Sequence, residues 1–109
     1  MLKLIKSLRT PFIFLLDKRY KEAKISQIMK YMTSRPYVPD FFDCDDYAWL
    51  FKSKAIERGI TGVGFVIGFY KFRLHAWNVL LGDEIYQVEP QNGIAFKRNK
   101  NYIPLVVII

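Results

Sequence analysis

The second half of the sequence, from Val63 onward, is a series of short apolar runs separated by turn residues. The runs are VGFVIGFYKF (63–72), LHAWNVLL (74–81), IYQVEP (85–90) and IPLVVII (103–109). They are rich in β-branched and aromatic residues, while GDE and a loop containing NG supply turn signals between them. Strands joined by such connections predict an antiparallel meander, which leaves helices to the first half of the chain.

The first half predicts two helices. Residues 18–33 place apolar side chains close to helical spacing after a possible N-cap at Asp17, and this run ends before Pro36. Residues 44–58 form a second helical run, which stops at Gly59 because glycine is common just after a helix end.

We therefore expect the class α+β, with N-terminal helices packed on an antiparallel β-sheet. The short run FIFLL (12–16) fits either a buried strand or the entry to a helix. At 109 residues the chain predicts a single domain. In this domain, residues 1–35 would form a basic N-terminal segment and helix, and residues 40–109 would form a core of cysteine helix and β-meander.

The net charge of +7 is concentrated at the N-terminus. Residues 1–35 carry nine Lys or Arg against Asp17 and Glu22, whereas residues 36–109 carry eight of each sign. The basic segment predicts either a solvated face or a patch that binds an anionic partner, such as nucleic acid, phospholipid or an acidic protein.

The expected location is the cytoplasm. The N-terminus has a short apolar run and no small-residue cleavage site, so a secretory signal is disfavoured. No stretch reaches the ~20 apolar residues of a transmembrane segment. The single cysteine excludes an internal disulfide framework and suits a reducing compartment.

That cysteine begins the second predicted helix. Asp43 and Asp46 have the spacing of a capping box, and Cys44, Ala48 and Ala55 fall on one stripe with Phe51. The stripe predicts that Cys44 lies at the N-terminal tip of the buried face. Free backbone N–H groups and the helix dipole favour a thiolate there, although a buried, inert cysteine is the alternative.

The aspartates beside Cys44 predict a second role for this helix start. Asp43, Asp45 and Asp46 offer the oxygen ligands that calcium or manganese prefers. No cofactor is required for thiol chemistry, and capping of the helix is the simpler explanation for the same residues. The acidic first turn also suits the positive end of the helix dipole.

The only histidine, His75, shares one face of its predicted strand with Trp77. Glu89 follows on the next strand. If the loop between these strands has an odd length, centred on Gly82 or Asp83, Glu89 shares the face of His75 and lies within reach of it. A thiol, an imidazole and a carboxylate in this order form the arrangement of nucleophile, base and orienting acid.

The motifs DCDDYAWLFKSKAIERGI, GVGFVIG, HAWNV and YQVEPQNG together resemble the core of the transglutaminase-like cysteine protease superfamily, which has a papain-like fold. DCDDYA is also similar to the DCEDYA motif of bacterial transglutaminase-like cysteine proteinases. The acidic cysteine motif and EPQ are similar to the calcium-dependent cysteine protease domain of some fungal agglutinins. The resemblance covers about residues 40–93.

The resemblance implies a thiol hydrolase or acyltransferase, specifically a cysteine peptidase or amidase. It would cleave an amide or ester bond of a peptide or protein through a Cys44 thioester. His75 would be the general base and Glu89 its orienting acid. The oxyanion or substrate would be bound by residues that include Asn78, Gln91 and Trp77. The alternative is a non-catalytic module of the same fold that binds a protein or nucleic acid through its basic N-terminal helix.

Overall fold

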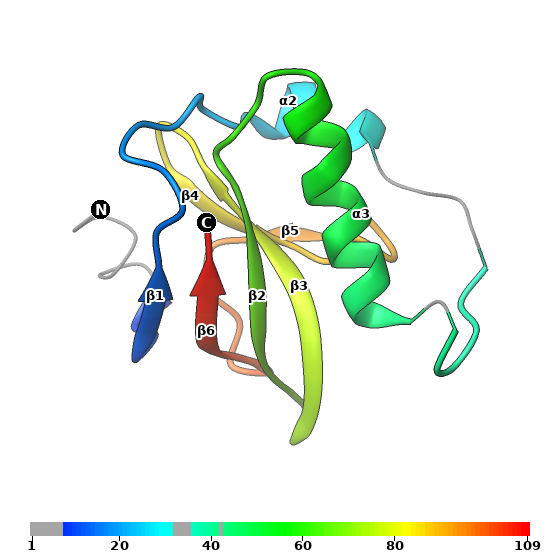
Figure 1. Ribbon diagram of the computed structural model, residues 1–109. Coiled ribbons are helices and arrows are strands. Elements are labelled where there is room, and N and C mark those ends of the chain that lie inside the picture. The colour runs from blue at the N-terminus through cyan, green and yellow to red at the C-terminus, as the bar shows by residue number, and fades with distance from the viewer. Residues whose placement is uncertain (1–7, 32–35, 42) are drawn as a thin grey trace.

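A computed structural model describes residues 8–31, 36–41 and 43–109 of the chain. Its centre is one six-stranded sheet with strand order β1-β6-β2-β3-β4-β5 (Figure 1). The strands are β1 (Phe12–Phe14), β2 (Val63–Tyr70), β3 (Arg73–Leu81), β4 (Ile85–Val88), β5 (Ala95–Phe96) and β6 (Tyr102–Ile108). The helical elements are α2 (Ile25–Ile28), the 3-10 helix η1 (Met29–Tyr31) and α3 (Cys44–Glu57).

The predicted meander is present in the structure. β2 pairs with β3, β3 with β4 and β4 with β5, and each pair is antiparallel. The last strand, β6, lies along the other edge of β2, also antiparallel. β1 then pairs with β6 in parallel, so the two ends of the described chain meet in one sheet.

The prediction of N-terminal helices packed on the sheet is wrong. The sheet dominates the structure, and the helix expected over 18–33 is reduced to α2 and η1. Residues 32–33 lie outside the described residues. The run FIFLL contributes β1 at the sheet edge, which makes the sheet mixed rather than antiparallel.

Long-range backbone hydrogen bonds explain why the chain before α2 is not helical. The N–H of Lys21 donates to Thr61 Oγ1 at 2.8 Å, and its carbonyl accepts from the N–H of Gly62 at 2.8 Å. The N–H of Ala23 donates to the carbonyl of Leu81 at 3.1 Å. These groups are satisfied by segments about 40 to 60 residues away, which sequence spacing does not reveal.

The core lies on both faces of the sheet. α3 covers one face, where Ala48, Phe51 and Ala55 are buried with β2 and β3 side chains such as Val63 and Leu80 (Figure 1). The predicted stripe on this helix is confirmed by their burial. Two alanines on the stripe allow the helix axis to approach the sheet closely.

The opposite face is covered by the N-terminal segment rather than by a second helix. Leu8 packs there with Val66, Trp77 and Val107, all buried. Tyr20 closes this side, and its hydroxyl donates to the carbonyl of Ile109 at 2.8 Å. No helix among the described residues is long and apolar enough to cross a membrane.

Candidate thiol–imidazole site

Cys44 is the first residue of α3. The predicted capping box is present: the side chain of Asp43 caps the N3 backbone, and the N–H of Asp43 donates to Asp46 Oδ2 at 3.1 Å. The box fixes where the helix begins and therefore where the thiol points. Cys44 is a half-buried free thiol that lines a pocket of about 490 Å³ together with His75.

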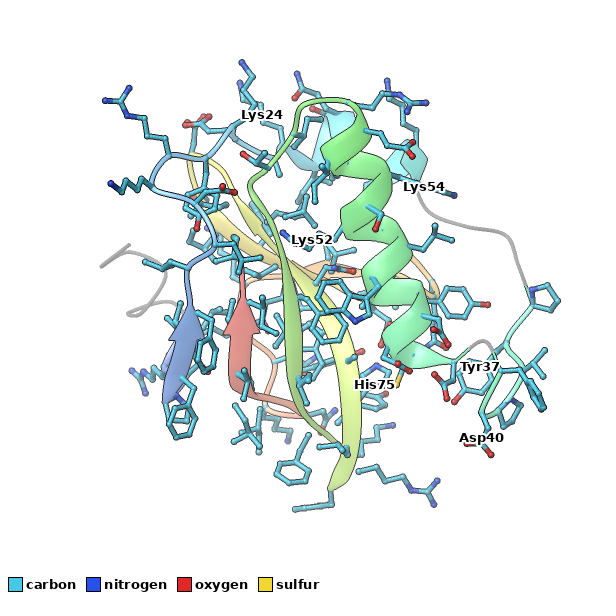
Figure 2. The ribbon with its side chains drawn as sticks, viewed as in Figure 1. Lys24, Tyr37, Asp40, Lys52, Lys54 and His75 are labelled. Carbon is cyan, nitrogen blue, oxygen red and sulfur yellow. The ribbon has the colours of Figure 1, made fainter. Side chains whose placement is uncertain are left out.

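His75 reaches this pocket from β3. β4 pairs with β3 only between Asn78 and Leu81, so the strand edge beside His75 has no partner from β4. Figure 2 shows His75 next to the N-terminal end of α3, with Tyr37 and Asp40 on the loop that leads into the helix. Tyr37 also lines the pocket. The thiol and the imidazole therefore meet where the helix tip lies against the open edge of β3.

Glu89 lies against the imidazole. Its Oε1 is 2.5 Å from His75 Nε2, and the carboxylate is buried. The register follows the odd-loop prediction, because Leu81 pairs with Ile85 across a three-residue turn centred on Asp83. With this register Glu89 and His75 share a face as diagonal neighbours, so this prediction is confirmed.

Two further contacts fix the carboxylate of Glu89. The hydroxyl of Tyr102 donates to Oε1 at 3.3 Å, and the backbone N–H of Gln91 donates to Oε2 at 3.4 Å. The pKa of Tyr102 is raised by burial and by the charge of Glu89, so this hydroxyl stays protonated as a donor. The backbone of Glu89 is held as well, by bonds to Ile94 and Gly93.

Opposing effects set the pKa of His75. Burial of the ring lowers it, whereas hydrogen bonds to Cys44 and Glu89 and their charges raise it, to about 9. The imidazolium is thus the form present at neutral pH. A protonated imidazole beside a thiol stabilises the thiolate, which is the reactive form of cysteine.

We expect the ring of His75 to titrate with a midpoint near pH 9. Its pKa is raised above the unfolded value of about 6.5, so its contribution to stability is full below about pH 6.5 and is lost as pH rises through 9. The loss amounts to about 3 kcal/mol. Because this is the only histidine, its ¹H–¹³C ring resonance reports the titration without assignment.

The matched variant for this titration is Glu89→Gln, which keeps the size of the side chain and removes its charge. We expect the midpoint of His75 to fall in this variant, because the charge of Glu89 is one of the causes that raise the pKa of the ring. A wild-type midpoint near the reference value of about 6.5 would show that the carboxylate contact does not hold the ring protonated.

The other predicted site residues are Asn78, Trp77 and Gln91, and none of them is among the residues that line the pocket of Cys44 and His75. Asn78 is fully buried, and its amide donates to the carbonyls of Ala48 and Gly64, each at 3.0 Å. Trp77 is also buried, and its Nε1 donates to Gln87 Oε1 at 2.8 Å. Gln91 contributes its backbone N–H to Glu89.

These contacts give Asn78, Trp77 and Gln91 positioning roles. The Asn78 amide joins α3 to β2, and the Trp77 ring stacks under His75 at a centroid distance of 5.9 Å. The expected use of Asn78 as an oxyanion donor is therefore corrected, because both of its amide hydrogens bond to main-chain carbonyls. Its Oδ1 has no hydrogen-bond partner among the described residues.

The structure brings the three predicted metal ligands together. One ligand atom from each of Asp43, Asp45 and Asp46 lies within 4.8 Å of the others. The pKa of Asp43 is raised, first by a hydrogen bond from Asp45 and also by desolvation and the charge of that neighbour. The capping bonds account for two of these carboxylates, and calcium or manganese binding stays a prediction.

Sequence reasoning missed the aromatic side chains around the imidazole. Tyr70 lies 5.6 Å from His75 between ring centroids, and Tyr102 lies 6.3 Å from it. Tyr70 precedes the β2–β3 turn, so its position near His75 follows from the hairpin register. Tyr102 could not be found in this way, because nothing in the sequence indicates that β6 pairs with β2.

Several chains of solved structures match this chain in fold, and two of them are described here. One is described as a PSL1a–E64 complex and has a TM-score of 0.83 with 25% sequence identity. The other is Polyporus squamosus lectin bound to the human-type influenza-binding epitope Neu5Aca2-6Galb1-4GlcNAc, with a TM-score of 0.82 and 24% identity. Each match covers 99% of this chain, which spans 48% and 46% of those chains. No protein-family model and no curated protein matches the sequence.

These matches correct the family and the activity predicted from the motifs. The matched chains are those of a lectin, so the prediction of a transglutaminase-like cysteine protease, and with it of a peptidase or amidase, is wrong on this finding. The alternative, a papain-like module that binds through a basic N-terminal helix, has no support either, since that helix is not formed as predicted. The chain has the fold of about half of a Polyporus squamosus lectin chain.

Proposed function

We propose that Cys44, His75 and Glu89 form a nucleophilic thiol site that binds electrophilic ligands covalently. The observation that carries this proposal is the 2.5 Å contact between His75 and Glu89 in a site whose pocket Cys44 also lines. The description of one fold neighbour as a complex with E64 supports it, because E64 is an epoxide and epoxides react with thiolates.

The proposed addition needs only the epoxide and the groups of the site. The sulfur of Cys44 attacks an epoxide carbon, so a C–S bond forms as the C–O bond breaks. The resulting alkoxide takes the proton of the His75 imidazolium, which becomes neutral. Glu89 holds the ring in one orientation throughout, because its carboxylate is itself held by Tyr102 and Gln91.

The chemistry needs Cys44 as a free thiol, which a reducing compartment such as the cytoplasm maintains. It needs no cofactor. A calcium or manganese ion at Asp43, Asp45 and Asp46 would neutralise the carboxylates beside the sulfur, and this remains part of the proposal.

The test is adduct formation with E64, followed by intact-protein mass spectrometry. We expect the folded wild type to gain the mass of one E64 molecule and Cys44→Ser to gain none. Protein unfolded in urea is the control: it should lose its reaction with E64 while still reacting with iodoacetamide, since only the folded site aligns the three groups. No adduct on the folded wild type, or an adduct on Cys44→Ser, would contradict the proposal.

A second candidate function is glycan binding. It is favoured by the match of nearly the whole chain to a lectin whose described complex contains Neu5Aca2-6Galb1-4GlcNAc. We propose that the chain binds such sialylated glycans, and calorimetric titration with this trisaccharide should then give saturable binding. Galb1-4GlcNAc, which lacks the sialic acid, is the control. Absence of heat with the trisaccharide would contradict this second proposal.

A further inference from the structure

A second pocket, of about 390 Å³, lies away from the thiol and contains three basic residues. Arg9 approaches it from the segment before β1, and Arg98 and Lys100 approach it from the loop between β5 and β6. Among the described residues that line it, none is acidic. All ten Asp and Glu of the chain belong to the described ranges, and no ion pair is found there for these three cations.

The loop that presents two of the cations is held in place by amide side chains. Gln87, which is buried on β4, donates from Nε2 to the carbonyl of Lys97 at 3.1 Å. Asn99 accepts the N–H of Asn101 on its Oδ1 at 2.9 Å, and its carbonyl accepts the N–H of Tyr102 at 2.9 Å. The backbone on which Arg98 and Lys100 sit is therefore ordered before any ligand binds.

The neighbouring cation, Lys97, differs from Arg98 and Lys100 because it has an acidic partner. Its ammonium pairs with Glu84 at 2.8 Å, and Lys97 is not among the residues that line the pocket. Arg9 is fixed from the other side. Its backbone has a φ of 53°, in the left-handed region that non-glycine residues rarely adopt, and its neighbour Leu8 is buried in the core. Two distant segments thus hold three cations around one pocket.

Cations gathered without a carboxylate repel one another, and a bound anion relieves that repulsion. Guanidinium groups match the oxygens of phosphate in a bidentate manner, and an ammonium adds a point charge. Leu8, Ile103 and Pro104 supply apolar surface in the same pocket. We propose that this pocket binds a phosphate ester whose phosphate contacts Arg9, Arg98 and Lys100 and whose organic part lies against the apolar residues.

This site goes beyond the proposed thiol chemistry but is connected to it. Tyr102 lines the pocket and also donates its hydroxyl to Glu89. Gln87 lines it too, and accepts the indole N–H of Trp77, whose ring stacks on His75. Filling the pocket should therefore perturb the Trp77 indole resonance, which makes a local reporter available that does not depend on reactivity at Cys44.

The experiment is an NMR titration of ¹⁵N-labelled full chain with phenyl phosphate and, separately, with inorganic phosphate, at constant ionic strength. We expect saturable shifts of the Trp77 indole N–H with both, and tighter binding of phenyl phosphate because of the apolar lining. Arg98→Gln and Lys100→Gln should each weaken binding about tenfold or more. Arg19→Gln, a charge change outside this pocket, should leave the affinity unchanged.

Vesicles containing phosphatidic acid distinguish a lipid source from a free ester. Sedimentation with these vesicles, lost in Arg98→Gln, would assign the phosphate to a lipid headgroup. Binding of phenyl phosphate without sedimentation would assign it to a free ester. If no phosphate probe gives saturable shifts, or if Arg98→Gln, Lys100→Gln and Arg19→Gln weaken binding equally, the pocket is not a phosphate site and the inference is overturned.

Discussion

Replacing His75 by alanine should slow the addition of E64 to Cys44 at pH 7 by about 100-fold or more. Two contributions of the imidazolium are lost together. The imidazolium beside the sulfur stabilises the thiolate, which is the form that attacks the epoxide. A positioned proton donor contributes a further 10²- to 10⁴-fold in typical enzyme sites. Intact-protein mass spectrometry at several reagent concentrations gives the second-order rate constant directly.

The pH dependence of the E64 reaction rate distinguishes the role of the His75 proton from a change in how accessible Cys44 is to the reagent. Because the pKa of His75 is raised to about 9, its proton remains available at neutral pH and is lost as pH rises through 9. We expect the rate with E64 to fall above pH 9 in the wild type. In His75→Ala this fall should be absent, because the group that loses its proton has been removed.

Two further variants complete this test. Glu89→Gln keeps the shape of the carboxylate and removes its charge, so we expect a smaller loss, of about tenfold. Lys54→Gln, near the other end of α3, should react at the wild-type rate (Figure 2). A folded His75→Ala protein that reacts as fast as the wild type would make Cys44 an ordinary exposed thiol and remove the basis for a reactive site.

The local geometry of the site could be predicted because each part depends on short-range rules. The capping box formed by Asp43 and Asp46, three residues apart, sets where the helix begins and therefore where Cys44 lies. The turn centred on Asp83 sets the register that places Glu89 beside His75. Neither prediction depends on the structure of the rest of the chain.

The N-terminal structure could not be predicted by the same rules. Ala23 and Ile28 are both buried, yet the chain around Lys21 is not helical. Its backbone partners are at Thr61 and Gly62, which no periodicity connects with it. In the same way, the pairing of β1 with β6 joins segments that are far apart in the sequence. Local sequence patterns do not reveal it, so the prediction of N-terminal helices missed this strand.

The family prediction failed for a related reason. A cysteine at a helix start, a histidine on a strand and an acid on the next strand describe a local arrangement, and such arrangements occur on unrelated proteins. Comparison over the whole chain shows instead that its fold is that of about half of a lectin chain. Cys44 and His75 nevertheless line one pocket in this chain, and Glu89 contacts the imidazole. The chemistry of these three residues can be tested without assigning the chain to a family.

Gly68→Ala should destabilise the fold by about 3 kcal/mol or more, which is at the upper end of overpacking effects. Gly68 pairs with His75 on one side and with Pro104 on the other, at an irregularity in the β2–β6 register. A Cβ at this position would overlap the backbone carbonyl of Ile103 and come within 2.8 Å of the Trp77 ring. Because the carbonyl belongs to a paired strand, relief requires β6 to move.

Gly59→Ala is the matched control for Gly68→Ala. Its φ of 77° makes a side chain unfavourable, but an added Cβ meets nothing within 4 Å, so only a conformational cost of about 1 kcal/mol is expected. Urea denaturation followed by far-UV circular dichroism measures both variants. Equal losses would show that the cost at Gly68 is conformational, and that β2 and β6 are not packed as closely as the overlap with Ile103 requires. A larger loss for Gly68→Ala, accompanied by a shift of the His75 ring resonance, would show that the close approach of these strands also supports the imidazole through Trp77.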